Sequence, residues 1–297
     1  MKLYRFIMKD NVAAVLFVLP FLIGFFAFLI VPMAMSLYYS FTQFAIIRPP
    51  VFIGLDNYRR MIGDAALRQS LGATFYFAFA SVPLRLIFAL AIALLLFRST
   101  KMMGIYRAMY YLPSMLGGSV AVAILWRRMF FTTGTFNSIL DIFGLNRDMN
   151  WIGNPNTAIW TLIVLAAWQF GSSMLIFLAG LKQIPETYYE AARIDGGGKI
   201  YIFRRITLPL ITPVIFFNLV LQTINGFLSF NSAFLITDGG PLNTTNFFAL
   251  YMYNHTFAFQ NAGYAAALAW FMLVFLAVFT GLIFFSKRYW VYEGGFS

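Results

Sequence analysis

Residues 181–213 read LKQIPETYYEAARIDGGGKIYIFRRITLPLITP, a polar segment between two long apolar stretches of the chain. Pro185 suits the first turn of a helix, and Glu186 lies near the positive N-terminal end of that helix. Gly196 can adopt the left-handed conformation that ends a helix. The segment therefore predicts a helix of roughly ten residues between its proline and glycine breaks. Because such a helix is too short to be stable alone in water, we expect it to dock against another surface.

The chain on either side of this segment is strongly apolar. A transmembrane helix needs about 20 predominantly apolar residues. Six stretches reach this length: residues 12–35, 71–97, 108–126, 158–181, 213–236 and 262–286. The first follows basic residues, as a secretory signal does, but it is longer than the roughly 7–15 apolar residues of a signal, so we expect it to be retained. The sequence predicts an all-α integral membrane protein with six transmembrane helices.

Composition excludes most other classes of protein. Of the 297 residues, 61% are hydrophobic and 10% are charged, whereas soluble domains are roughly 45–50% apolar and about 25% charged. The chain contains no cysteine, which excludes a disulfide scaffold, zinc–thiolate and iron–sulfur sites, and a cysteine nucleophile. No internal repeat or domain linker is visible. We therefore expect a single transmembrane domain over residues 1–297.

The net charge of +11 is explained by membrane topology, because cytoplasmic connections are enriched in Lys and Arg. Most basic residues fall at the two ends of the chain and in the connections after the second and fourth apolar stretches: Lys2, Arg5, Lys9, Arg98, Lys101, Arg107, Lys182, Arg193, Lys199, Arg204, Arg205, Lys287 and Arg288. This distribution predicts that both termini and the 181–213 segment are cytoplasmic. It also argues against nucleic acid as a partner.

The helix predicted after Pro185 has the residues of a contact surface. We expect its exposed side chains to be Tyr188, Tyr189, Glu190, Arg193 and Asp195. Ala191 and Ala192 are small enough to allow close approach of another surface. The helix is therefore predicted to contact a cytoplasmic partner.

The same segment resembles a known family. Glu190-Ala-Ala, followed two residues later by Asp195-Gly196, resembles the EAA loop of the membrane subunits of binding-protein-dependent ABC importers. With Ile184-Pro185 ahead of it and Leu208-Pro209 and Pro213 behind it, the segment is similar to the carbohydrate branch, the maltose and glycerol-phosphate type of permease. Further matches extend the resemblance over residues 12–290: Tyr106-Arg107, Pro113, residues 120–126, Gly134, Asn137, residues 237–245 and residues 263–267. Gly197 departs from the alanine expected after Asp-Gly.

The resemblance implies a type I ABC importer permease fold (MetI-like), with its core over residues 70–290 and a coupling loop at residues 182–205. It implies a transport subunit of the cell membrane, not an enzyme, which forms the path for a carbohydrate by alternating access. The implied partners are a second permease subunit, usually a different chain, two ATPase subunits and an extracellular solute-binding protein.

In that family the short cytoplasmic helix sits in a cleft of the ATPase, where the glutamate matching Glu190 pairs with a basic residue. The resemblance therefore implies a coupling role for one set of residues: Tyr189, Glu190, Ala191, Ala192, Asp195 and Gly196. Closure of the ATPases on ATP would then move the paired permease subunits as rigid bodies.

The glycines of this loop do not form a nucleotide site. Gly196-Gly-Gly-Lys199 is similar to part of a P-loop, but that motif needs a glycine five residues before the Gly-Lys pair and Ser or Thr after it. Arg193 and Ile200 occupy those positions. We therefore expect no cofactor in this chain, with ATP and magnesium bound by the partner ATPase.

Polar residues in the apolar stretches are candidates for contact with cargo. One set recurs at spacings of 4, 3, 4 and 3, which places it on one stripe of a helix: Asn218, Gln222, Asn225, Ser229 and Ser232. Their uncharged hydroxyl and amide groups suit a neutral sugar or polyol. Interhelical hydrogen bonding is the alternative reading. Trp168 and Gln169 are further candidates for the same cavity.

Arg85 is the one charged residue deep in an apolar stretch, and His255 is the single histidine. A buried Arg must be paired or solvated, so we expect Arg85 to be anchored by backbone carbonyls, by a loop carboxylate or by a partner subunit. Contact with an anionic group on the cargo is the alternative. His255 has no Cys, Asp or Glu at ligand spacing, and we expect it to be structural.

Two further classes fit poorly. An ion-coupled secondary transporter usually carries ionisable residues in several spans. A membrane enzyme would need a catalytic cluster, whereas the ten acidic residues are scattered. The sequence does not name the sugar, and the same architecture serving a glycerol phosphate or another polyol remains open.

Overall fold

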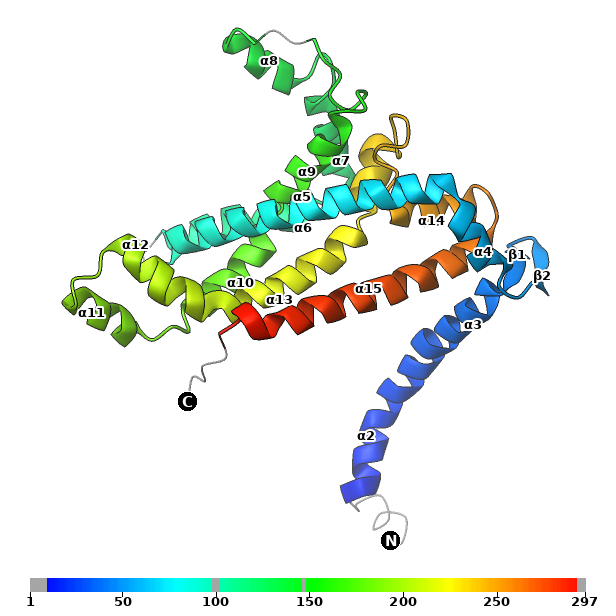
Figure 1. Cartoon of the computed structure of the whole chain (residues 1–297), viewed down its shortest axis with the longest axis horizontal. Helices are drawn as coiled ribbons and strands as arrows, with labels where there is room; N and C mark the ends of the chain where they lie inside the picture. Colours follow the sequence, from blue (N-terminus) through cyan, green and yellow to red (C-terminus); the bar gives the residue numbers. More distant parts are fainter. Residues whose placement is uncertain (1–9, 98–101, 146–147, 293–297) are drawn as a thin grey trace. The chain divides into compact units, whose positions relative to one another are not determined.

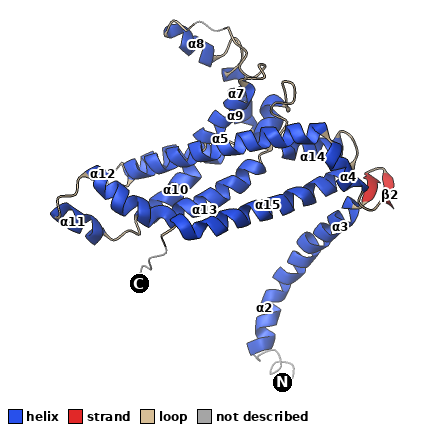
Figure 2. Ribbon diagram, in the orientation of Figure 1, coloured by secondary structure: helices blue, strands red, loops and turns tan. Residues whose placement is uncertain are grey.

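The computed structural model describes residues 10–97, 102–145 and 148–292. They form two compact units, one made of the chain up to Gly63 together with Met252–Val274, and one made of Asp64–Tyr251 and the chain from Phe275 onward. Helices dominate both units (Figure 2). Several basic residues used above for topology lie outside the described residues: Lys2, Arg5, Lys9, Arg98 and Lys101.

The first unit begins with one long apolar helix, and its elements are α2 (Asp10–Phe25), the π-helical turn η1 (Phe26–Ile30) and α3 (Val31–Ser40). A hairpin of β1 (Thr42–Ala45) and β2 (Arg48–Phe52) follows, with Thr42 opposite Phe52, and then α4 (Asp56–Gly63). Asn57 links α4 to the end of α3 and to β1, because its side-chain amide donates to the backbone carbonyls of Ser40 and Thr42 at 2.9 Å each.

The unit is completed by the end of α14 (Phe248–Phe257) and the first half of α15 (Ala262–Trp290). His255 is buried there, and its ring makes edge contacts with Phe259 and Tyr264 at centroid distances of 5.1 and 4.9 Å. It therefore packs among aromatic rings.

The second unit is a helical bundle around α5 (Ala65–Leu96), which packs against α9 (Ala158–Trp168), α10 (Gly171–Leu181) and α13 (Leu208–Phe227) (Figure 1). Asp64 caps α5 by accepting from the backbone N–H of Leu67 at 3.1 Å. The shared core holds small residues of α5 against large ones of α10, as with Ala89 and Ala93 and with Met174 and Phe177.

Shorter elements complete this unit. They are α6 (Met103–Leu116), α7 (Val120–Met129), α8 (Thr135–Ile142), α11 (Glu186–Ile194), α12 (Lys199–Ile202), the π-helical turns η2 (Phe203–Thr207) and η3 (Ala233–Thr237), and the adjoining parts of α14 and α15.

Within the described residues, five helical segments are long and apolar enough to cross a membrane: Val15–Ser40, Ala65–Leu96, Ala158–Leu181, Lys199–Phe227 and Ala262–Trp290. A sixth span exists if α6 and α7, which meet at an angle of 94°, are counted together. Five or six spans match the predicted fold class. The span predicted at residues 108–126 was wrong in its shape. Ser119 leaves helical geometry and caps α7, which begins at Val120, because its hydroxyl accepts from the backbone N–H of Val122.

The span predicted at residues 213–236 was also wrong in its bounds. The helical segment starts earlier, at Lys199, and ends at Phe227. Residues 228–230 leave the helix, and helical geometry resumes at Asn231, directly before η3 begins at Ala233. This early end brings polar side chains of the loop back toward the bundle.

Candidate functional site: a polar cavity and an exposed helix

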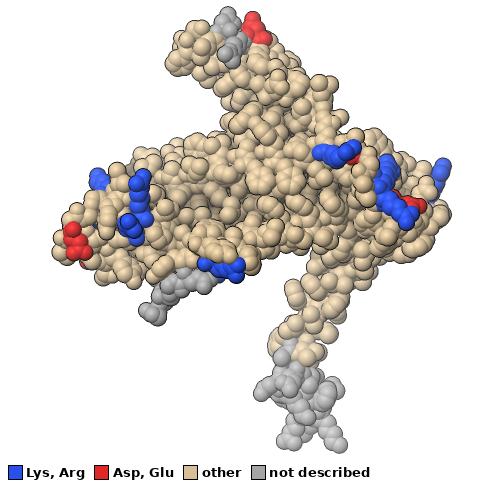
Figure 3. Space-filling view, in the orientation of Figure 1, with Lys and Arg blue, Asp and Glu red and all other residues tan. Residues whose placement is uncertain are grey.

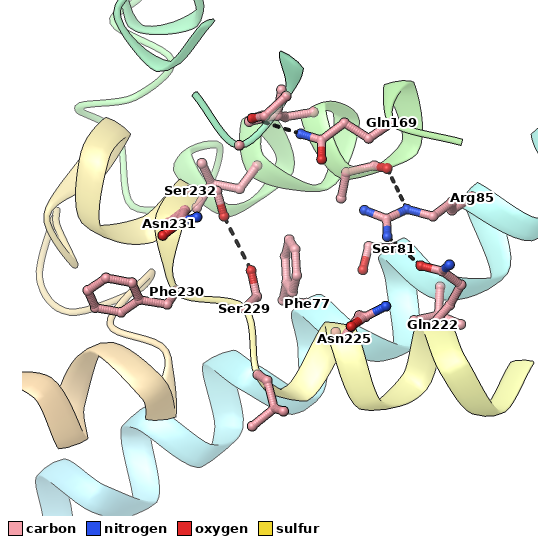
Figure 4. Close-up of a pocket in the computed structure, with 18 of the residues that line it drawn as sticks. Phe77, Ser81, Arg85, Gln169, Gln222, Asn225, Ser229, Phe230, Asn231 and Ser232 are labelled. Carbon is pink, nitrogen blue, oxygen red and sulfur yellow. Dashed lines mark hydrogen bonds between the residues drawn. The ribbon is translucent and has the colours of Figure 1, made fainter. Parts of the chain in front are cut away.

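A cavity of about 420 Å³ lies inside the second unit, between α5, the break that separates α9 from α10, the end of α6 and the end of α13. This volume falls in the range of small-ligand sites, roughly 300–1,000 Å³. Its polar lining residues are Ser81, Arg85, Ser114, Gln169, Ser172, Gln222, Asn225, Ser229, Asn231 and Ser232. Phe77 and Phe230 contribute aromatic rings (Figure 4).

Arg85 projects from α5 into this cavity and is held by two neutral acceptors. Its Nε donates to the carbonyl of Ala166 at 2.7 Å, and one terminal nitrogen donates to Oε1 of Gln222 at 2.5 Å (Figure 4). The carbonyl is free because α9 ends at Trp168, and the last turn of a helix leaves its carbonyls without intrahelical partners. The guanidinium therefore sits at the negative end of α9, where a cation is favourable.

Close packing of α13 on α5 brings Gln222 to Arg85. A Cβ added to Gly226 would lie 3.2–3.3 Å from side-chain carbons of Val82 and Ala78, so the two backbones approach closely at this point. Gln222 lies one turn before Gly226 on α13, and only 4% of its surface is exposed. Gln222 and Arg85 thus meet one helical turn from the point where α13 and α5 approach closely.

The break between α9 and α10 is held by the end of α6. Ser114 donates from Oγ to the carbonyl of Gln169 at 3.0 Å and accepts from the N–H of Ser172 at 3.1 Å. The Gln169 amide donates to the carbonyl of Gly117 at 3.2 Å. At Gly171 a Cβ would lie 2.5 Å from the Tyr110 carbonyl oxygen, so only glycine fits. These contacts fix the position of the α9–α10 break, which forms one wall of the cavity.

The structure brings together most of the cargo residues predicted from the sequence. Gln222, Asn225, Ser229, Ser232 and Gln169 all line the cavity, and the Ser229 and Ser232 hydroxyls lie 3.3 Å apart. The prediction that all five polar residues of the stripe share one helix was wrong, because α13 ends at Phe227. Ser229 reaches the cavity from the break after α13, and Ser232 reaches it from the helical turn that precedes η3.

Two predicted cargo residues lie elsewhere. Asn218 is fully buried beside α5 and α10, and its side-chain amide has no partner among the described residues. Trp168 is outside the cavity, with its ring 5.9 Å from that of Trp126. Asn218 shares a helix face with Gln222 and Asn225, but it does not line the cavity, because a stripe of residues on a long helix extends beyond any one cavity.

Sequence reasoning missed several lining residues: Phe77, Ser81, Ser114, Gly117 and Asn231. Ser81 lies four residues before Arg85 on the same helix face, so the two polar residues together carried a usable signal. Ser114 and Gly117 carried none, because their role depends on a break in a helix that comes later in the chain.

The predicted helix after Pro185 is present as α11, nine residues from Glu186 to Ile194. Gly196 has a φ of +77°, the left-handed conformation expected at its end. Together with α12, α11 lies at one end of the second unit, where charged side chains gather (Figures 1 and 3). Tyr188, Glu190, Arg193 and Asp195 are exposed there, as predicted, and Ala191 is exposed too.

Tyr189 was predicted to be exposed, and this was wrong. Only 9% of its surface is exposed, and its ring packs 6.3 Å from that of Phe97. Its hydroxyl lies 3.4 Å from that of Thr207, which accounts for the polar end of the side chain. Ala192 is also buried, at 7%. These two residues dock α11 onto its own chain, while Glu190 and Ala191 face outward.

The comparisons with known proteins identify the family. The sequence pattern of the family described as "Binding-protein-dependent transport system inner membrane component" matches residues 8–289. The chain belongs to this family. It is thus a transport subunit, and the resemblance inferred from the EAA segment is confirmed.

The permease is 49% identical over 295 residues to the "Probable ABC transporter permease protein YesP" of Bacillus subtilis (strain 168), covering 98% of this chain and 96% of the relative. It is 33% identical over 275 residues to the trehalose/maltose transport system permease protein MalF of Thermococcus litoralis, covering 92% of each.

A solved structure shares the permease's fold. The crystal structure of a bacterial alginate ABC transporter, in complex with an alginate pentasaccharide-bound periplasmic protein, contains a chain that matches with a TM-score of 0.82. The match covers 97% of this permease and 98% of that chain at 23% identity. The predicted importer permease fold is therefore confirmed.

Proposed function

We propose that this permease forms the membrane path of an ATP-driven importer for a carbohydrate. The observation that carries the proposal is the cavity, whose wall presents hydroxyl and amide groups together with two aromatic rings. Sugar hydroxyls both donate and accept hydrogen bonds, as these side chains do. The apolar faces of sugar rings can pack on Phe77 and Phe230. The 33% identity to a trehalose/maltose permease supports the same class of cargo.

The proposed assembly contains a second permease subunit, a different chain, with two ATPase subunits that hold ATP and magnesium and an extracellular solute-binding protein. In it the coupling loop at residues 182–205 docks on an ATPase through the exposed face of α11. Glu190 and Ala191 supply the contact, and Asp195 and Gly196 shape the turn that ends the helix. Tyr189 and Ala192 act from beneath by holding α11 on the bundle.

The proposed topology places both termini and α11 on the cytoplasmic side of the cell membrane. Lys182, Arg193, Lys199, Arg204 and Arg205 all belong to the loop that would be cytoplasmic, and such enrichment in basic residues favours that side. In the same proposal the permease is one functional domain, with its core over residues 70–290.

Co-purification tests the assembly. A tagged permease, expressed with its native partners and extracted in mild detergent, is expected to retain an ATPase and a second permease subunit in stoichiometric amounts. A chain that purifies alone and supports ATP-independent transport in vesicles would refute the proposal and favour a secondary transporter.

A matched pair of variants tests the coupling helix. Glu190→Ala is expected to reduce ATPase retention and uptake without lowering the amount of permease in the membrane. Glu186→Ala is the control, because Glu186 is an exposed glutamate on the same helix. Equal behaviour of the two variants would remove Glu190 from the coupling contact.

A further inference from the structure

We propose that the cargo of this permease is an acidic saccharide, whose carboxylate binds Arg85 inside the cavity. The inference deepens the proposed function and rests on it. It replaces the neutral sugar or polyol predicted from the polar stripe alone. That prediction did not take into account that Arg85 lines the same cavity as the polar residues of the stripe.

The cavity carries an uncompensated positive charge. Among the residues that the structure describes, Arg85 is the one charged residue that lines the cavity, and no lining side chain is Asp or Glu. The two groups that hold the guanidinium are a backbone carbonyl and an amide oxygen, both neutral. The end of α9 offers the equivalent of about half a negative charge, so net positive charge remains. A neutral sugar would leave it without a counter-ion, whereas an anionic group supplies one.

The guanidinium also has donors to spare. An Arg side chain carries five N–H donors, and the described contacts engage one on Nε and one on a terminal nitrogen. Figure 4 shows the guanidinium directed into the space bordered by Ser81, Gln169 and Asn225. The remaining donors match the planar fork of a carboxylate, which Arg binds in a bidentate manner. A phosphate dianion would meet only this single cation.

The opposite end of the cavity suits the rest of a sugar. Ser229, Asn231 and Ser232 gather there beside Phe230, away from Arg85 and Gln222 (Figure 4). The wall is thus divided into a charged end and a hydroxyl, amide and aromatic end. A uronic acid residue presents the same two faces, a carboxylate on one side of a polyhydroxylated ring.

Uptake of chemically matched saccharides tests this assignment. Cells that carry the permease with its native partners are given labelled short oligouronides from alginate and from polygalacturonate, and the same oligosaccharides after reduction of every carboxyl group to an alcohol. The permease is expected to take up at least one oligouronide about tenfold or more faster than its reduced form, the factor expected from one charge-assisted hydrogen bond. Sugar phosphates form a third arm, and a preference for them over every oligouronide would overturn the carboxylate assignment.

Variants then assign the preference to Arg85. Arg85→Gln is expected to bring the ratio of acidic to reduced uptake to near one, while Arg85→Lys keeps part of it because the charge remains. Arg68→Gln is the control, since Arg68 is an exposed cation on the same helix and outside the cavity. An unchanged ratio in Arg85→Gln would overturn the inference.

Failure of the inference is distinguishable from failure of the proposed function. Permease-dependent uptake of neutral or reduced saccharides, without preference for acidic ones, would refute the role of Arg85 and leave a carbohydrate importer. Absence of permease-dependent uptake of every saccharide would refute both.

Discussion

Replacing Gln222 with Leu separates the structural role of the polar cavity wall from its role toward cargo. The Gln222 side chain is 4% exposed, and its Oε1 accepts from Arg85 at 2.5 Å. Leu has nearly the same helix propensity and occupies a similar volume, so the main loss is one acceptor for a half-buried cation. A hydrogen bond to a charged group contributes about 1.5–3 kcal/mol. Gln222→Leu is therefore expected to lower the free energy of unfolding by that amount.

Asn225→Leu is the matched control, because Asn225 lies one turn further along α13 and lines the same wall. It is exposed and has no hydrogen-bond partner among the described residues. Substitutions at such positions usually change stability by less than about 0.5 kcal/mol. Asn225→Leu is expected to reduce uptake while leaving stability unchanged, whereas Gln222→Leu reduces both.

Thermal unfolding of the purified permease in nanodiscs, followed by circular dichroism, measures the difference. A change of 1 kcal/mol shifts Tm by roughly 2–4 °C in a chain of about this size, so Gln222→Leu should lower Tm by roughly 3–12 °C. In the double variant with Arg85→Met the two losses should not add, since both remove one contact. Equal melting of the two single variants, or strict additivity in the double variant, would refute the assignment.

The remaining predictions concern docking of α11, the helix break and topology. Tyr189→Ala should destabilise the permease by about 3–5 kcal/mol, the usual cost of removing a buried aromatic ring, and should weaken ATPase retention. Tyr188→Ala, at an exposed position on the same helix, should leave the melting temperature unchanged, and equal melting temperatures of the two variants would contradict the docking role. Gly171→Ala should cost about 1–3 kcal/mol through overpacking against the Tyr110 carbonyl, and normal unfolding would show that the break can relax. Single cysteines placed at Lys2 and Ser297, positions outside the described residues, should react with impermeant thiol reagents only from the cytoplasmic side, and external labelling of either would overturn the topology.

Local chemistry accounts for what could be predicted about α11. Pro185, Glu186 and Gly196 each have a conformational preference that acts over a few residues, and the helix they bound appeared between them. Its exposure pattern was less predictable. Tyr188 and Tyr189 are adjacent and chemically identical, and only the position of Phe97 and Thr207 decides that the second one is buried.

Helical periodicity also predicted only part of the cavity lining. It placed Gln222 and Asn225 on one face correctly, because both precede the end of α13. It failed beyond Phe227, where the chain leaves the helix, and at Asn218, which is buried and does not line the cavity.

The sequence by itself determined the membrane class, the family and the short helix α11, since each depends on composition or on residues close together in the chain. Only the tertiary structure decided where the charge of Arg85 lies. Its partners, Ala166 and Gln222, are 81 and 137 residues away in sequence. One became available because a helix breaks, and the other because two helices pack closely at Gly226. No local pattern encodes either event, because both arise from packing between distant segments.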